Sequence, residues 1–120
     1  MSHEVPQEVV ELAERLCNKK SGFKRYPMAA VIYKGRKPTI ISTGVNRHLF
    51  IGSDIKRKVY SIHAERDAIS GCSKQDLWGA SIFIFRKKGL LAKPCPKCMN
   101  LIMSTGISHI HWSNNLQGVE

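Results

Sequence analysis

Residues 81–112, SIFIFRKKGLLAKPCPKCMNLIMSTGISHIHW, decide which class of fold this chain adopts. The stretch opens with residues 81–85, which are mostly apolar and suit a buried strand. Residues 96–105 carry apolar side chains at helical spacing and are followed by Gly106, a residue type that often ends a helix. Residues 107–112 predict a second strand. A strand, a helix and a strand in this order predict a β-α-β unit with parallel strands.

The first part of the chain adds a helix and a hairpin to this unit. Apolar residues follow an i, i+3, i+4 pattern through residues 4–19, which predicts an amphipathic helix. Residues 28–33 and 39–45 are rich in strand-forming side chains and flank a turn sequence, GRKP, at residues 35–38. This arrangement is typical of a β-hairpin.

The middle of the chain joins the hairpin to the β-α-β unit. We expect a polar, basic connection over residues 46–60 and then a helix over residues 62–72, with Ser61 as its N-cap. The resulting order predicts an α/β fold, a three-layer α/β/α sandwich around a mixed sheet that is parallel where helices intervene. Because no repeat or linker interrupts the sequence, we expect one domain over residues 1–120.

The composition favours an anionic partner. The chain has 19 Lys and Arg against 9 Asp and Glu, a formal net charge of +10 and a pI near 9.8. A small domain this basic attracts nucleotides, nucleic acid or an anionic membrane, although a solvated basic surface without a partner also fits. The sequence shows neither a signal peptide nor an apolar run near the ~20 residues that span a bilayer. We therefore expect a soluble, cytoplasmic protein with no membrane partner.

Two of the four cysteines form a C-x-x-C pair, Cys95 and Cys98, where a loop meets the predicted helix. Residues three apart lie on one side of a helix, so both sulfurs face the same way. The free amides of a helix N-terminus favour the thiolate form that metals bind. The pair alone fits half of a zinc site, a redox dithiol or coincidence.

The sequence His63-Ala64-Glu65, at the start of the preceding helix, supplies the missing part of a metal site. A catalytic zinc ion takes three protein ligands and keeps a fourth position open for water. Cys95, Cys98 and His63 are three such ligands. Residues two apart in a helix point in nearly opposite directions, so His63 and Glu65 share a site only if the metal lies over the helix N-terminus.

Together, HAE at residues 63–65 and PCPKC at residues 94–98 resemble the H-x-E…P-C-x-x-C signature of the zinc-dependent nucleobase deaminases. Residues 62–69 and 94–110 are similar to deoxycytidylate deaminases and to bacterial tRNA adenosine deaminases. The resemblance extends over about residues 25–113, because the order of predicted elements also matches that of the cytidine deaminase superfamily.

The resemblance implies a role for six residues. His63, Cys95 and Cys98 would bind Zn²⁺, and Glu65 would carry protons without binding the metal. The backbone amide of Ala64 would face the base, and Asn46 would hydrogen-bond the sugar or base of the substrate. The resemblance also implies a homo-oligomer, a dimer or larger.

Two classes of enzyme substrate stay open at this stage. The first is a free cytosine nucleotide such as dCMP or CMP, which the closer resemblance around the C-x-x-C motif favours. The second is a polynucleotide, with adenosine in tRNA or cytosine in a single strand as the target base. The basic runs at residues 56–58 and 86–88 fit a substrate phosphate and a nucleic-acid backbone equally.

A third class is a non-catalytic, nucleic-acid-binding module with a structural zinc ion. It requires a fourth protein ligand, and His109 or His111 would be the source, because both share one face of a predicted strand. This class leaves Glu65 without a role, and we rank it last.

Overall fold

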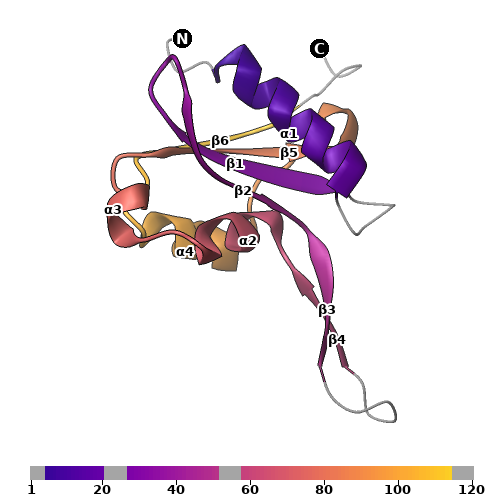
Figure 1. Cartoon of the computed structure of the whole chain (residues 1–120). Coiled ribbons are helices and arrows are strands. Elements are labelled where there is room, and N and C mark those ends of the chain that lie inside the picture. The colour runs from indigo at the N-terminus through magenta and orange to yellow at the C-terminus, as the bar shows by residue number, and fades with distance from the viewer. Residues whose placement is uncertain (1–4, 21–26, 52–57, 115–120) are drawn as a thin grey trace.

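The computed structural model describes residues 5–20, 27–51 and 58–114 (Figure 1). Within these residues, no helix is both long enough and apolar enough to cross a membrane. The helices and strands, in chain order, are α1 (Gln7–Lys20), β1 (Met28–Lys34), β2 (Thr39–Val45), β3 (Arg47–Ile51), β4 (Lys58–Ile62), α2 (Ala64–Ser70), α3 (Lys74–Leu77), β5 (Ser81–Arg86), the 3-10 turn η1 (Lys87–Gly89), α4 (Pro96–Met103) and β6 (His109–Trp112).

The centre of the molecule is a four-stranded sheet in the order β2-β1-β5-β6. Strand β1 is antiparallel to both of its neighbours, whereas β5 and β6 are parallel and joined through α4. Helix α1 lies on one face of this sheet, and α2 and α4 lie on the other (Figure 1). The predicted α/β/α sandwich around a mixed sheet is therefore confirmed, including the parallel pair across a helix.

Both faces of the central strands are buried, which explains why β1 and β5 are apolar without alternation. One face carries Ile32, Ile82 and Ile84 into the core beneath α2 and α4. The opposite face carries Phe83 and Phe85 into a second core beneath α1. Burying a large aliphatic or aromatic side chain contributes about 1.5–3 kcal/mol, so the residues of β1 and β5 stabilise the sheet from both faces.

The polar, basic connection predicted over residues 46–60 contains two strands that were not predicted, at residues 47–51 and 58–60, while residues 52–57 lie outside the described part of the chain. Strands β3 and β4 pair antiparallel from Arg47 opposite Ile62 to Ile51 opposite Lys58, and form a separate two-stranded sheet. This ribbon projects from the body of the molecule (Figure 1). Residues with strand-forming side chains occupy both arms, and this pairing satisfies the backbone groups that a free loop would leave to water.

The start of the second helix also differs from the prediction, because Ser61 and Ile62 belong to β4. Helix α2 begins at Ala64, and the N-cap is His63, whose φ of −73° and ψ of 153° are extended. The strand pairing therefore moves the N-cap two residues along the chain, from Ser61 to His63. This shift decides where the imidazole of His63 lies.

Helix α2 packs unusually close to β2, and Gly44 makes this possible. A Cβ atom at Gly44 would lie 2.3 Å from the backbone N of Ala68 and 2.5 Å from the carbonyl O of Ala64. The Ser42 hydroxyl donates a 2.6 Å hydrogen bond to the Ala68 carbonyl in the same contact. The packing of β2 on α2 thus sets the position of the helix start.

We expect Gly44→Ala to destabilise the protein by about 1–3 kcal/mol, because backbone rather than a flexible side chain opposes the new methyl group. The comparison is Gly71→Ala, since a Cβ at Gly71 meets nothing within 4 Å. Thermal unfolding of the two variants checks this expectation. Equal midpoints for both would show that α2 does not depend on the close approach.

Candidate functional site

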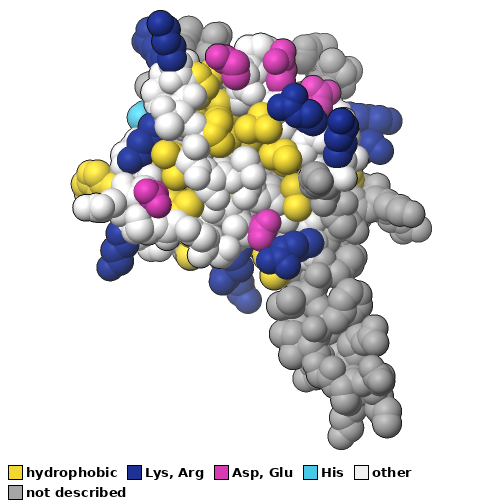
Figure 2. Space-filling model, viewed as in Figure 1, with side chains coloured by type: hydrophobic (Ala, Val, Ile, Leu, Met, Phe, Trp, Pro, Cys, Tyr) yellow, Lys and Arg dark blue, Asp and Glu magenta, His cyan; other side chains and the backbone are white. Residues whose placement is uncertain are grey.

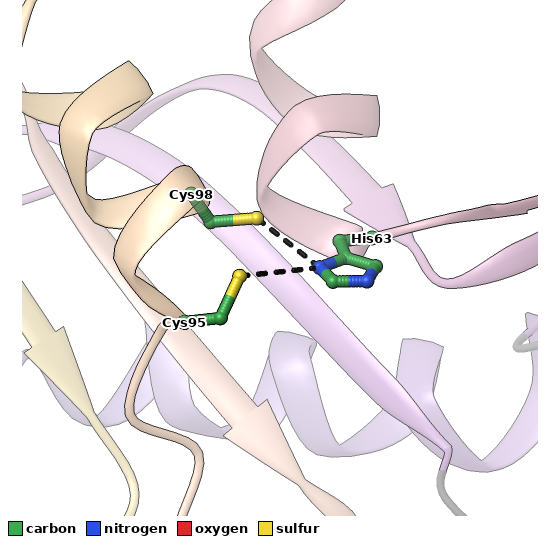
Figure 3. Close-up of side chains that lie close together, drawn as sticks. All are labelled: His63, Cys95 and Cys98. Carbon is green, nitrogen blue, oxygen red and sulfur yellow. Dashed lines mark hydrogen bonds between the residues drawn. The ribbon is translucent and has the colours of Figure 1, made fainter.

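The structure brings His63, Cys95 and Cys98 together at the adjacent N-termini of α2 and α4 (Figure 3). His63 is the N-cap of α2, and Cys95 is the N-cap of α4 with Pro96 at the first helical position. Cys98 lies in the first turn of α4. The extended backbone at both caps places the His63 and Cys95 side chains ahead of their helices, where they meet Cys98.

The three candidate ligand atoms are close enough to share one ion. His63 Nδ1 lies 3.1 Å from Cys98 Sγ and 4.0 Å from Cys95 Sγ, and all three atoms lie within 4.8 Å of one another. A tetrahedral zinc ion with ordinary Zn–N and Zn–S bonds separates its ligand atoms by about 3.5–3.8 Å. One imidazole and two free thiols at this spacing therefore fit zinc as three protein ligands.

The two thiols have different environments. The backbone N–H of Cys98, as the largest influence, lowers the pKa of Cys95, which lies at the exposed end of the cluster. Burial raises the pKa of Cys98 to about 12, and the charge of Glu65 adds to the shift. A metal ion that binds both sulfurs must displace a proton from Cys98, so binding couples to proton release.

Glu65 is buried next to this cluster. Its side chain is 3% exposed, and burial raises its pKa, an effect that hydrogen bonding and the neighbouring His63 partly offset. The carboxyl is close enough for its charge to influence both Cys95 and Cys98. A buried carboxyl with a raised pKa suits proton transfer near neutral pH.

Asn46 and Ala64 are the residues predicted to contact substrate. Both lie at the end of the sheet where His63, Cys95 and Cys98 meet. Asn46 follows β2, is 7% exposed, and accepts a 2.9 Å hydrogen bond from the Met28 backbone N–H at its Oδ1. The Asn46 backbone N–H donates to the Met28 carbonyl. Ala64 is the first residue of α2 and is 1% exposed. Substrate contact by either residue stays a prediction.

His109 and His111 do not join the cluster, contrary to what the structural-zinc interpretation required. Their neighbours Ile110 and Trp112 pack on the core beneath α2 and α4, so the alternation of β6 directs both histidines to the α1 face. The two imidazoles stack on each other instead, with ring centroids 6.2 Å apart. Within the described residues, the cluster has three protein ligands and no fourth.

Ser113, just beyond β6, organises the loop that leads to Cys95, and no sequence pattern predicted this role. Its hydroxyl accepts from the Arg86 backbone N–H (3.1 Å) and donates to the Leu90 carbonyl (2.6 Å). Its carbonyl accepts from the Ala92 N–H at 2.9 Å. The loop over residues 86–92 is thus tied to the sheet at its start, middle and end.

Comparison with known proteins agrees with this geometry. A family model described as the cytidine and deoxycytidylate deaminase zinc-binding region matches residues 3–114. A curated protein, the deoxycytidylate deaminase of Mycobacterium phage D29, is 36% identical over 50 residues, which is 42% of this chain and 34% of that protein. The matched part spans about a third of that relative's own length.

Solved structures share the fold. The apo form of a dCMP deaminase from cyanophage S-TIM5 matches with a TM-score of 0.65 and 22% identity, over 99% of this chain and 90% of that one. Two forms of Acinetobacter baumannii RibD match with TM-scores of 0.54 and 0.57 and identities of 15% and 17%, over 85% and 88% of this chain but only 26% and 27% of theirs. Because the family model matches residues 3–114 of 120, the chain belongs to the family of the cytidine and deoxycytidylate deaminase zinc-binding region, as residues 63–65 and 94–98 had indicated.

Proposed function

We propose that this protein is a zinc-dependent deaminase that hydrolyses a cytosine nucleotide of the dCMP or CMP type to the uracil form, with release of ammonia. The observation that carries the proposal is the juxtaposition of three ligand atoms within 4.8 Å of one another and a buried Glu65 beside them. His63, Cys95 and Cys98 would hold the zinc ion that is characteristic of the family. Glu65 is the acid and base.

The three candidate zinc ligands and Glu65 have separate roles in the proposed reaction. Held by His63, Cys95 and Cys98, a zinc ion would make the attacking water more acidic. Glu65 accepts a proton from the attacking water and passes it to the ring nitrogen beside the amino-bearing carbon. Glu65 then takes the proton of the hydroxyl group now on that carbon and delivers it to the departing amine, which leaves a carbonyl. One water is consumed, the C–N bond breaks, a C–O bond forms, and ammonia leaves, so the atoms balance.

Three features support a nucleotide as the substrate. The phage D29 relative and the cyanophage S-TIM5 structure are both described as acting on deoxycytidylate. Asn46 lies at the site end of the sheet, where an amide suits hydrogen bonding to a sugar or base. The loop over residues 86–93 leads directly to Cys95 and carries exposed Lys87, Lys88 and Lys93, which suit a phosphate.

A polynucleotide substrate is the second candidate, and the net charge of +10 is the observation in its favour. Figure 2 shows Lys and Arg side chains around the rim of one face, some of them next to one another and next to acidic side chains. A nucleic-acid backbone that binds along the surface requires neighbouring cations along its path. Of the basic run at residues 56–58, residues 56 and 57 lie outside the described part of the chain.

Ammonia release from a panel of compounds tests the proposal. The panel contains cytidine, deoxycytidine, CMP, dCMP, dCTP, single-stranded DNA and tRNA, each incubated with zinc-loaded protein. We expect the highest kcat/KM with a monophosphate. Turnover of single-stranded DNA or tRNA with dCMP inert would instead establish the polynucleotide candidate. The expected dimer or larger assembly stays a prediction, which light scattering of the same sample checks.

The lysines of the loop should contribute to phosphate binding. In the double variant Lys87→Ser/Lys88→Asn we expect a higher KM for dCMP. The KM for deoxycytidine, which has no phosphate, should not change. Asn replaces Lys88 because this residue has a φ of 64°, which Asn tolerates. KM for dCMP should vary weakly with salt, whereas a single strand that contacts Z phosphates gives a slope magnitude near ~0.7Z.

The matched control removes two exposed cations from the β1–β2 turn, in Arg36→Ser/Lys37→Ser. Its net charge changes equally, so a shared rise in KM would reflect the overall field and not a local contact. Identical kinetics in all three proteins would mean that the lysines of the loop are only a solvated surface.

A further inference from the structure

One carboxylate on α2 bonds to both chain neighbours of Asn46, to the backbone of one and to the side chain of the other. Asp67 Oδ2 accepts a 3.0 Å hydrogen bond from the Val45 backbone N–H, and Asp67 Oδ1 accepts from Arg47 Nε at 3.1 Å in an ion pair. Val45 and Arg47 are the two chain neighbours of Asn46. Val45 ends β2 and Arg47 starts β3, so the two contacts lie at the junction of these strands.

Asn46 is held from the other side by β1. Its backbone N–H and its Oδ1 both bond to the backbone of Met28. Asn46 therefore lies between a strand that holds its side chain and a helix that holds the Val45 backbone N–H and the Arg47 side chain. Both Asp67 contacts are charge-assisted, and the Asp67 side chain is 20% exposed. The Arg47 side chain is 47% exposed, so water screens the ion pair more than it screens the part-buried bond to the Val45 N–H.

The position of Asp67 on α2 gives these contacts a functional meaning. Its backbone N–H donates a 3.0 Å hydrogen bond to the carbonyl of His63, so it lies in the first turn, directly after the residues of the site. Glu65 lies two residues before it on the same helix. A shift of α2 against β2 would change the distance between Glu65 and Asn46, and Asp67 resists that shift.

We propose that Asp67 is a positioning residue that fixes Asn46 relative to the Glu65 end of α2 and thereby sets how tightly the cytosine nucleotide binds. The inference rests on the proposed function, because it takes Asn46 as a substrate-binding residue. Asp67 itself touches no reacting atom. Its removal should weaken binding of the ground state and of the transition state alike, which raises KM and spares kcat.

The experiment compares KM, kcat and zinc content in wild type, Asp67→Ala and Arg47→Gln. We expect KM for dCMP to rise about tenfold in Asp67→Ala, with kcat within about twofold and zinc content unchanged. Arg47→Gln keeps the Val45 contact and should give a smaller rise. The control is Asp76→Ala, which removes the capping box of α3 at the opposite end of the sheet (Figure 1) and should lower stability without moving KM.

A double-mutant cycle separates positioning from general destabilisation. Asn46→Asp keeps an oxygen for the Met28 N–H but replaces the amide. In that background, Asp67→Ala should raise KM no further, because its effect passes through Asn46. Additive effects would overturn the inference, and so would an unchanged KM in Asp67→Ala of an active enzyme. A wild-type protein that turns over no cytosine nucleotide would overturn the proposed function, and this inference with it.

Discussion

Glu65→Gln should retain zinc and the fold but lose about 10²–10⁴-fold in kcat, the usual contribution of a general acid–base group. Because Glu65 moves more than one proton in the cycle, we expect a loss toward the upper end of this range. The amide has nearly the same volume, so the buried site keeps its packing. Steady-state ammonia release, metal content and thermal unfolding of the two proteins measure the three expectations.

The matched control for this change is Glu14→Gln on the exposed surface of α1. It removes the same charge far from the cluster, so its kcat should equal that of wild type. A loss of less than about tenfold in Glu65→Gln would mean that another group carries the protons. A loss of zinc from Glu65→Gln would mean that the carboxylate supports the metal and not the proton transfer.

Cys98→Ala should abolish zinc binding, taking the zinc content from about one per chain to about zero. The change leaves two of the three ligands. It also leaves a gap in place of the Cys98 sulfur, because Cys98 is only 4% exposed. Zinc binding contributes folding free energy, so the unfolding midpoint should fall as well. Metal analysis after gel filtration, together with the Cys95→Ala/Cys98→Ala double variant, measures the effect.

Cys72→Ala is the control, because Cys72 is a half-buried free thiol outside the cluster. It should keep zinc and activity. Full zinc occupancy in the Cys95→Ala/Cys98→Ala protein would rule out the assigned ligands.

The same site predicts how zinc affinity depends on pH. The pKa of Cys98 is raised to about 12, so this thiol is protonated throughout the neutral range and zinc must displace its proton. Apparent affinity should therefore fall as pH falls, by about tenfold per pH unit for each proton released. Competition with a chelator across a pH series measures this dependence. An affinity independent of pH would contradict thiolate ligation.

The sequence predicted the parts of the fold that depend on local patterns. The apolar runs at residues 28–33, 39–45 and 81–85 predicted β1, β2 and β5 to within a residue at each end. Strands β3 and β4 were not predicted, because lysines and arginines interrupt the pattern of strand-forming residues in this part of the sequence. Helix α3 was also missed, although Ser73 and Asp76 carry the S-x-x-D spacing of a capping box.

The candidate site was predictable where its residues are close in sequence. The spacing of His63 to Glu65 and of Cys95 to Cys98 is short, and the signature of the family joins the two pairs. The contacts of Asp67 and Ser113 depend on which backbone groups the folded sheet brings to them. No periodicity encodes such contacts, so only the structure shows them.

Conversion of dCMP in water enriched in ¹⁸O tests the central claim most directly. The account predicts ammonia and dUMP in equal amounts from zinc-loaded wild-type protein, with one ¹⁸O atom at the carbon that carried the amino group. It also predicts that Glu65→Gln, loaded with the same zinc, forms almost no product. Failure of the zinc-loaded wild-type protein to form the uracil product from dCMP or any other cytosine compound of the panel would contradict the account.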